Sequence, residues 1–344
     1  MNRFLRPCPA ALSAALIFTG CHTTPMPATD PATMRTEGTV ERLDPRFDAL
    51  IPPGTELEVV ADGFGFSEGP VWVRKEGHLL FSDIPNNRVM RWHEQEGLSE
   101  FLKPSGYTGT DERRGGLGSN GLTLDSRGQL ILCQHGDRRI ARLDKDGSFE
   151  TIADRFMGRR LNSPNDAVFK SNGDLYFTDP PYGLPRGDQD PSKEIPFQGV
   201  YRLGTDGQLT LLTSDLSRPN GIAFSPDEKT LYVANSDPER ALWMAYPVKE
   251  DGTLAPGRVL RDVTLLVGKR KGLPDGLKVD ARGHIWATGP GGVLVLTPEG
   301  DHLGTLRTGE ATGNCAWGND GSVLYITASM YLMRVRTTTQ GKLP

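Results

Sequence analysis

The sequence predicts an all-β fold, a six-bladed β-propeller, and three observations lead to this prediction. Gly occurs 41 times and Pro 26 times in 344 residues, which favours tight turns over long helices. Strand-length runs rich in β-branched and aromatic residues are bounded by Gly, Asp and Asn, while apolar residues at helical spacing are scarce. Finally, one pattern repeats six times, in units of roughly 40–55 residues with three or four strands each, the size of a propeller blade. An open β-solenoid is less favoured because its coils are shorter.

Each unit begins with an acid or amide residue that runs into a short apolar segment. The six starting segments are residues 67–72, 119–124, 164–169, 219–224, 274–279 and 313–317. A polar turn and a second strand follow in every unit, and most units add a third strand, such as residues 139–143 and 199–203. The last unit has only three strands, whereas residues 56–60 form a spare strand before the first unit. We expect the spare strand to pair with the last blade, which would close the ring and cover its edge.

The first forty residues are predicted to lie outside the propeller. Arg3 and Arg6 precede an apolar run over residues 10–19 that is too short to span a membrane. The segment at its end, residues 18–21, resembles a lipoprotein processing box that finishes at Cys21, with Phe18 where Leu is usual. Ordinary signal cleavage is the alternative. We therefore expect a lipoprotein-type signal peptide over residues 1–21, a Pro- and Thr-rich flexible tether over 22–40, and one propeller domain over 41–344. The protein would be exported to a bacterial periplasm or anchored to a membrane by its lipid.

Composition excludes several other classes of protein and site. A net charge of −4 argues against binding nucleic acid, and the body of the chain lacks an apolar stretch of about 20 residues, so membrane contact is expected only through the lipid. Cys133 and Cys315 are expected to be buried free thiols. Residues 65–69 fit the G-x-S-x-G pattern of serine hydrolases, but a strand follows instead of the required helix.

The residue that starts the first strand of each unit is the candidate functional residue. First strands line the central channel of a propeller, so these six residues should meet around one axis: Glu68, Asn120, Asn165, Asn220, Asp275 and Asn314. Such oxygens are costly to desolvate without a partner, and two facing carboxylates more so, unless a cation lies between them. Carboxylate and amide oxygens suit Ca²⁺, and the ring has no His or Cys for zinc. The alternative is turn chemistry, since Asn-Gly is a common turn pair, but this explains Glu68 poorly.

A second set of polar residues follows the ring members by 14 or 15 positions. These are Asp83, His135, Asp179 and Asn235, and they are predicted to line a cup above the metal. Turn chemistry explains the acids and the amide equally well. His135 is the exception, because a turn has no need of imidazole, and we expect it to contact substrate or transfer a proton.

Residues 40–336 resemble the family of senescence marker protein, gluconolactonase and luciferin-regenerating enzyme, and most closely its bacterial gluconolactonase branch. The most specific stretches are residues 66–70, 119–121, 133–136, 163–166, 177–183, 219–221 and 274–276. The resemblance implies a six-bladed propeller with a divalent metal bound by Glu68, Asn220 and Asp275, and with Asn165 as a fourth ligand or water contact. Animal members carry a substrate-contacting Arg two residues before the latter Asn. Ser163 stands there in this chain, so that contact does not carry over.

The resemblance implies metal-dependent hydrolysis of a small sugar lactone, such as glucono-1,5-lactone, to the aldonic acid. Asp275 is the expected base and His135 the second candidate; Asn120, Asn165, His135 and Tyr182 are expected to bind substrate. Ca²⁺ is the expected metal, with Mg²⁺, Mn²⁺ or Zn²⁺ as alternatives, and the protein is expected to be a monomer. Two other functions stay open: a metal-dependent hydrolase of a phosphotriester or a different lactone, and a non-enzymatic sugar-binding surface lipoprotein.

We predict that Cys21 is lipidated in the native host. The apolar run followed by Thr19, Gly20 and Cys21 is the reason. Mass spectrometry of the mature N-terminus measures it, and a chain that starts at another residue without lipid mass would rule it out.

Overall fold

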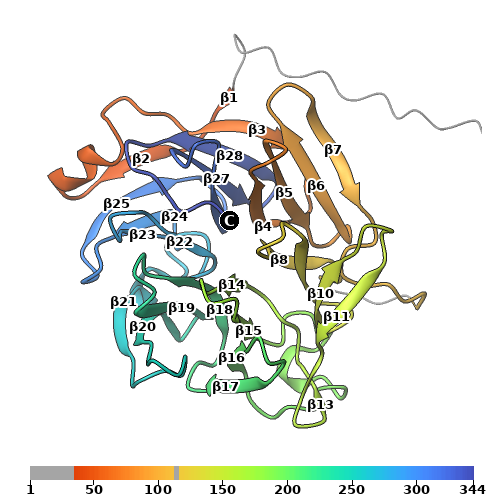
Figure 1. The fold of residues 1–344 in the computed structure, drawn as a ribbon. Coiled ribbons are helices and arrows are strands. Elements are labelled where there is room, and N and C mark those ends of the chain that lie inside the picture. Colours follow the sequence, from red (N-terminus) through yellow and green to blue (C-terminus); the bar gives the residue numbers. More distant parts are fainter. Residues whose placement is uncertain (1–34, 112–115) are drawn as a thin grey trace, which may run out of the picture.

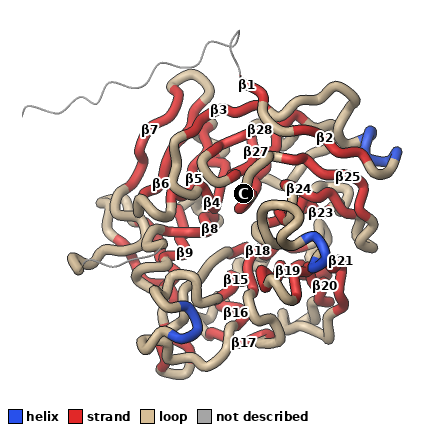
Figure 2. Tube along the Cα trace, turned by 180° about the vertical axis from the view of Figure 1, so that it is seen from behind, coloured by secondary structure: helices blue, strands red, loops and turns tan. Residues whose placement is uncertain are grey.

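Six antiparallel sheets surround one axis, and each sheet pairs its strands in order from the axis outward (Figure 1). The computed structural model describes residues 35–111 and 116–344. Within them, helical structure is limited to three short 3-10 segments at the periphery: η2 (Pro45–Ala49), η3 (Gly187–Gln189) and η4 (Thr264–Leu266) (Figure 2). The chain is a closed six-bladed propeller, as the repeats predicted, and an open solenoid is excluded.

The first three blades contain four strands each. Blade one contains β4 (Ser67–Val73), β5 (His78–Asp83), β6 (Arg88–His93) and β7 (Gly97–Leu102). Blade two contains β8 (Ser119–Leu124), β9 (Leu130–Gln134), β10 (Arg139–Leu143) and β11 (Phe149–Ala153). A small hairpin of β12 (Arg155–Phe156) and β13 (Arg159–Arg160) leads to blade three, which contains β14 (Ala167–Phe169), β15 (Leu175–Asp179), β16 (Gly199–Leu203) and β17 (Leu209–Thr213).

The last two blades each gain strands from the N-terminal side. Blade four is regular, with β18 (Pro219–Phe224), β19 (Thr230–Asp237), β20 (Arg240–Pro247) and β21 (Arg258–Asp262). Blade five contains β22 (Leu277–Val279), β23 (Ile285–Gly289), β24 (Gly292–Leu296), β25 (His302–Arg307) and then β2 (Thr39–Arg42). Blade six contains β26 (Thr312–Gly318), β27 (Val323–Ala328), β28 (Tyr331–Arg336), then β3 (Glu58–Asp62) and β1 (Arg35–Thr36).

The apolar runs of the second strands follow from burial on both faces. Successive side chains of a strand point to opposite faces of its sheet. In β15, Leu175 and Phe177 pack into the core shared with blade two, and Tyr176 between them packs into the core shared with blade four. Six such cores, one between each pair of neighbouring blades, hold the ring together.

The spare strand closes the ring as predicted, two residues later in the chain than expected. β3 pairs with β28, with Val59 opposite Met333 and Glu58 opposite Arg334. The guanidinium of Arg334 lies 2.5 Å from Glu58 and 2.5 Å from Glu94 of blade one, so a buried cation joins the last blade to the first.

The flexible tether was predicted to extend to residue 40, and this boundary is wrong. Residues 35–40 form β1 and the start of β2 instead of a free tether. Asp44 then caps η2 by accepting a hydrogen bond from the Arg46 N–H at 2.8 Å, and Phe47 fills the core between blades five and six. A four-residue strand in a Thr-rich segment gives too weak a periodicity to be separated from a tether. The predicted signal peptide and the rest of the tether, residues 1–34, lie outside the described residues.

Three smaller expectations concern side chains and membrane spans. Cys133 and Cys315 are buried free thiols, as predicted. Ser67 is buried in β4, and its hydroxyl donates to the carbonyls of Ser329 and Tyr331, so the G-x-S-x-G match does not supply an exposed nucleophile. Across residues 35–111 and 116–344, no helix has the length and apolar character needed to cross a membrane.

We predict that removing residues 1–62 destabilises the ring, whereas removing residues 1–34 does not. The longer deletion removes β3 and the buried Phe47, Leu50, Ile51 and Leu57, each worth about 1.5–3 kcal/mol of burial, and exposes the edge of β28. The shorter deletion retains every contact given above and serves as the matched control. Melting temperature and light scattering are the measurements, and equal melting temperatures for both truncations would contradict the closure mechanism.

Candidate metal centre

The six predicted ring residues all lie at the channel entry of an inner strand. Glu68, Asn120 and Asn220 are the second residues of β4, β8 and β18, and Asn314 is the third of β26. Asn165 lies two residues before the start of β14, and Asp275 lies two residues before the start of β22. All are buried except Asp275, which is half-buried as a residue although its carboxyl group is enclosed by protein.

Glycine follows four of these residues because neighbouring blades approach too closely for a side chain. A Cβ on Gly69 would lie 2.1 Å from the carbonyl oxygen of Asn120 in the next blade. One on Gly276 would lie 1.9 Å from the side chain of Asn314. Gly121 and Gly221 are restricted in the same way. The Asn-Gly and Asp-Gly pairs therefore reflect contact between blades, and not the turn chemistry that was the alternative.

Hydroxyl groups of the second strands hold the neighbouring inner strands in place. Ser82 donates to the carbonyl of Asn120 at 2.8 Å, Thr178 to that of Asn220 at 2.7 Å, and Thr288 to that of Gly313 at 2.7 Å. Ser236 donates to the carbonyl of Pro274. Each bond crosses to the next blade, so the backbone that carries the ring residues is fixed from the side.

Two carboxyl groups face each other across this ring. Glu68 and Asp275 are close enough to share a hydrogen bond when one is protonated, and Asp166 adds a third buried carboxylate beside them. Burial and the charge of Asp166 raise the pKa of Glu68 to about 7. Burial and the charges of Glu68 and Asp166 raise the pKa of Asp275 well above its usual range. The protein thus concentrates negative charge where water is scarce, which a bound cation would relieve.

Hydrogen bonds decide which oxygens remain for a cation. Glu68 Oε2 accepts from the Gly69 N–H at 2.5 Å and from Asn314 Nδ2 at 3.1 Å, which leaves Oε1. Asn314 Oδ1 accepts from the Cys315 N–H at 2.9 Å, so its carbonyl is already used. Asn220 donates its amide to Ser236 at 2.9 Å, which leaves its Oδ1 available.

These donors fit a hard divalent cation better than zinc. In the described part of the chain, no three His, Cys, Asp or Glu side chains gather in a way that could hold a metal ion. A cation on the axis would therefore depend on amide oxygens together with the two facing carboxylates, which is a Ca²⁺-like donor set. The Oδ1 of Asn120, on the inner strand β8, is buried and lacks a hydrogen-bond partner within the described protein, so it is a further candidate oxygen.

The predicted cup of four polar residues is wrong for three of its members. Asp83 accepts from the Gly65 N–H and pairs with Arg88, Asp179 accepts from the Ser163 N–H, and Asn235 accepts from the Arg218 N–H. These bonds shape the loops that deliver the inner strands, so the turn interpretation holds for these three.

His135 does not belong to that set at all. Strand register places Asp83 opposite Ser67, Asn235 opposite Pro219 and Gln134, not His135, opposite Ser119. His135 therefore lies one residue further on, in the place that Ser236 holds in blade four, where the side chain contacts Asn220. Counting 14 or 15 residues could not detect this shift.

His135 and Tyr182 retain features of substrate contacts. The Nε2 of His135 is buried without a hydrogen-bond partner in the described structure, and burial lowers the pKa of His135 to about 4, so the imidazole is neutral near pH 7. The side chain of Tyr182 is 38% exposed, while its hydroxyl contacts the side chains of Ser236 and Asn220 near Asp275.

Sequence reasoning missed three channel residues: Asp166, Ser236 and Lys278. Asp166 occupies the position that holds glycine in four other units, and this departure from the repeat was a usable signal. Ser236 lies within β19, one residue beyond Asn235, where the counting placed the end of that strand. Lys278 gave no signal, because its role depends on contact with Asn314 in the next blade, at 3.4 Å.

We predict that the metal-free protein loses stability as pH rises from about 4.5 to about 7. Folded Glu68, with its pKa raised from 4.5 to about 7, keeps a proton that the unfolded chain releases, so the free energy of unfolding falls across this range. Glu68→Gln imitates the protonated side chain and should flatten the curve by roughly 1–3 kcal/mol. Urea unfolding in chelator at several pH values measures this effect, and parallel curves for both proteins would contradict it.

Comparison with known proteins agrees with the propeller fold. Residues 66–330 match the SMP-30/gluconolactonase/LRE-like region family. The gluconolactonase of Zymomonas mobilis subsp. mobilis is 39% identical over 315 residues, covering 89% of this chain and 88% of the relative. A gluconolactonase structure from Xanthomonas campestris is 31% identical, with a TM-score of 0.76 over 90% of this chain and 99% of that one.

A more distant structure shares the fold alone. It is a calcium-binding protein, regucalcin, from Agrobacterium tumefaciens, 21% identical with a TM-score of 0.66 over 83% of this chain and 95% of that one. With the family match spanning most of the propeller and a well-covered relative at 39% identity, the chain belongs to the SMP-30/gluconolactonase/LRE-like family.

Proposed function

We propose that this protein hydrolyses the ring ester of a small sugar lactone, such as glucono-1,5-lactone, with a divalent cation held on the propeller axis. Lactone hydrolysis is supported by family membership and by relatives named as gluconolactonases. The observation that carries the metal is the pair of facing carboxyls, Glu68 and Asp275, enclosed with amide oxygens at the closure of six inner strands.

Four residues would hold the cation. Glu68 Oε1 and Asn220 Oδ1 are the oxygens that their hydrogen bonds leave available, and we add Asp275, which faces Glu68, and Asn165, which holds the matching position before β14. When bound, the cation would polarise the lactone carbonyl and stabilise the oxyanion that develops on it. Ca²⁺ is the first choice because every donor is oxygen.

Asp275 is the proposed base that takes a proton from the attacking water. It lies two residues before the inner strand β22, and its carboxyl faces that of Glu68. His135 is the second candidate, since its neutral imidazole has an unused acceptor atom. A pKa of about 4 makes it a weak base, which favours a role in binding substrate hydroxyls together with Asn120 and Tyr182.

Two other functions make different predictions in the same assays. A phosphotriesterase would turn over paraoxon faster than glucono-1,5-lactone, and a lactonase with a different preference would favour a γ-lactone. A sugar-binding protein with a structural metal would bind sugars without turnover that is sensitive to chelators. The proposal requires chelator-sensitive turnover of the sugar lactone that returns when metal is restored.

We predict that Glu68→Gln and Asp275→Asn separate metal binding from chemistry. Glu68→Gln should lower the affinity for the cation, because it removes a ligand charge. The variant should regain much of its kcat at high Ca²⁺, because the proposed base is still present. Asp275→Asn should stay slow at saturating metal, by roughly 10²–10⁴-fold, the usual loss for a general base. His135→Ala should mainly raise KM. The measurement is kcat across a Ca²⁺ titration with bound metal counted independently.

Asp251→Asn is the matched control, since it removes one carboxylate from an exposed turn between β20 and β21 and should leave both metal binding and kcat unchanged. If metal-saturated Asp275→Asn turns over the lactone like wild type, Asp275 is not the base. If chelation leaves the wild-type rate unchanged, the metal-dependent mechanism is wrong.

A further inference from the structure

Lys278 brings a positive charge close to the candidate metal site. It lies on β22, three residues after Asp275, and its ammonium donates to the Leu277 carbonyl at 3.1 Å and to Asn314 Oδ1 at 3.4 Å. Asn314 in turn donates to Glu68 Oε2 at 3.1 Å. A chain of hydrogen bonds thus connects the Lys278 ammonium to the carboxylate of the candidate metal site.

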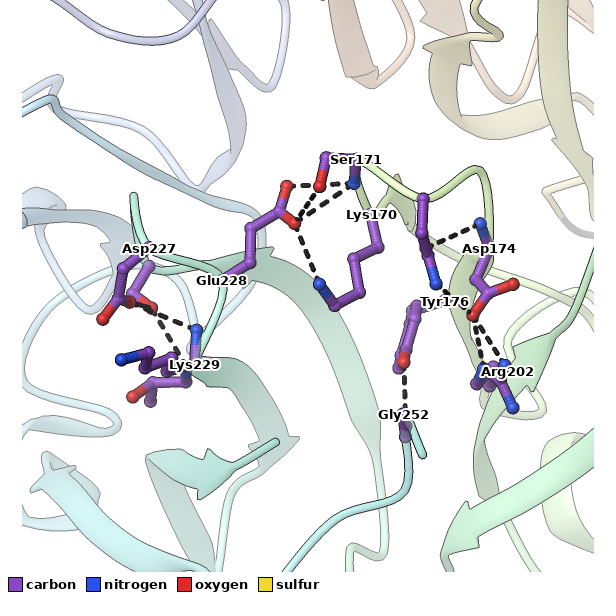
Figure 3. Close-up of polar contacts among 12 residues, drawn as sticks. Lys170, Ser171, Asp174, Tyr176, Arg202, Asp227, Glu228, Lys229 and Gly252 are labelled. Carbon is purple, nitrogen blue, oxygen red and sulfur yellow. Dashed lines mark hydrogen bonds and ion pairs between the residues drawn. The ribbon is translucent and has the colours of Figure 1, made fainter. Parts of the chain in front are cut away.

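Lys278 differs from the other cations around the cavity below the ring. This cavity, of about 1090 Å³, is lined by the inner strands and by residues 340–344, which lie over the centre of the ring (Figure 1). Lys170 lines the same cavity, but its ammonium is paired with Glu228 at 3.0 Å, as Figure 3 shows. Within the described residues, Lys278 forms no ion pair of its own, so its charge acts on the axial carboxylates.

The ionised side chains in the channel have a net negative charge that a divalent cation would neutralise. Glu68, Asp275 and Asp166 supply three carboxylates when ionised, and Lys278 supplies one ammonium. Without Lys278, the same channel would hold three negative charges and would suit a trivalent ion better.

We propose that Lys278 determines the charge selectivity of the axial site, because its ammonium offsets one carboxylate charge of the Glu68, Asp275 and Asp166 group. The inference rests on the proposed metal site and adds a residue that tunes the charge of the site without binding the cation or touching substrate. It predicts that the net charge of the wild-type site suits divalent cations. Removing the ammonium should increase the affinity for every cation, and the increase should be larger for a trivalent cation than for a divalent one.

The test compares Ca²⁺ and Tb³⁺ binding to the metal-free protein by calorimetry and terbium luminescence. Lys278→Met should lower the Kd for Ca²⁺ about tenfold and that for Tb³⁺ about thirtyfold, because the electrostatic energy scales with the charge of the ion. Lys278→Gln keeps an N–H donor for Asn314 without the charge and should behave like Lys278→Met. Lys278→Arg keeps the charge and should retain the wild-type ratio of affinities.

Two controls make the outcome specific to this channel. Lys170→Met removes the paired lysine of the same cavity and should change neither constant. Asp166→Asn combined with Lys278→Met removes one negative charge with the positive one and should restore the wild-type ratio. If Lys278→Met and Lys278→Gln bind both ions like wild type, Lys278 has no such role. If wild type binds no cation, or if Glu68→Gln binds the cation as tightly as wild type does, the proposed metal site is wrong, and this inference fails with it.

Discussion

The facing carboxyls of Glu68 and Asp275 are the interaction on which the rest of the site depends. Both pKa values are raised, first by burial and then by the charges of neighbouring carboxylates, which water cannot screen there. A fold selected only for stability would place apolar or neutral side chains at this position. The protein instead retains two acids, with Asp166 as a third nearby. This cost in stability is understandable if a cation normally occupies the axis.

The propeller provides the rigidity that such a site requires. The six interblade cores hold the sheets at fixed distances, and the hydroxyls of Ser82, Thr178 and Thr288 tie the inner strands of blades two, four and six to the preceding blades. Gly69 and Gly276 allow the inner strands to approach until the polar side chains meet. Donors positioned in advance avoid much of the reorganisation that would otherwise weaken both cation binding and stabilisation of an oxyanion.

The repeat could be predicted from the sequence because every blade solves the same packing problem. The two predicted third strands, β10 and β16, have the expected bounds, and the six candidate residues lie at or just before the start of the inner strands, where the repeat placed them. Features that depend on contacts between blades could not be found this way. One such feature is the strand register that places Gln134, and not His135, opposite Ser119. Others are the pairing of β2 with β25 and the contact of Lys278 with Asn314, which join residues that no local pattern relates.

The most direct measurement is a crystal structure of the protein soaked with Mn²⁺, with anomalous diffraction used to locate the ion. The account predicts one strong anomalous peak on the propeller axis, within coordination distance of oxygens from Glu68, Asn165, Asn220 and Asp275, with the Asn314 amide still donating to Glu68. An axis without a peak, with Glu68 and Asp275 hydrogen-bonded to each other while Mn²⁺ occupies another site, would contradict it.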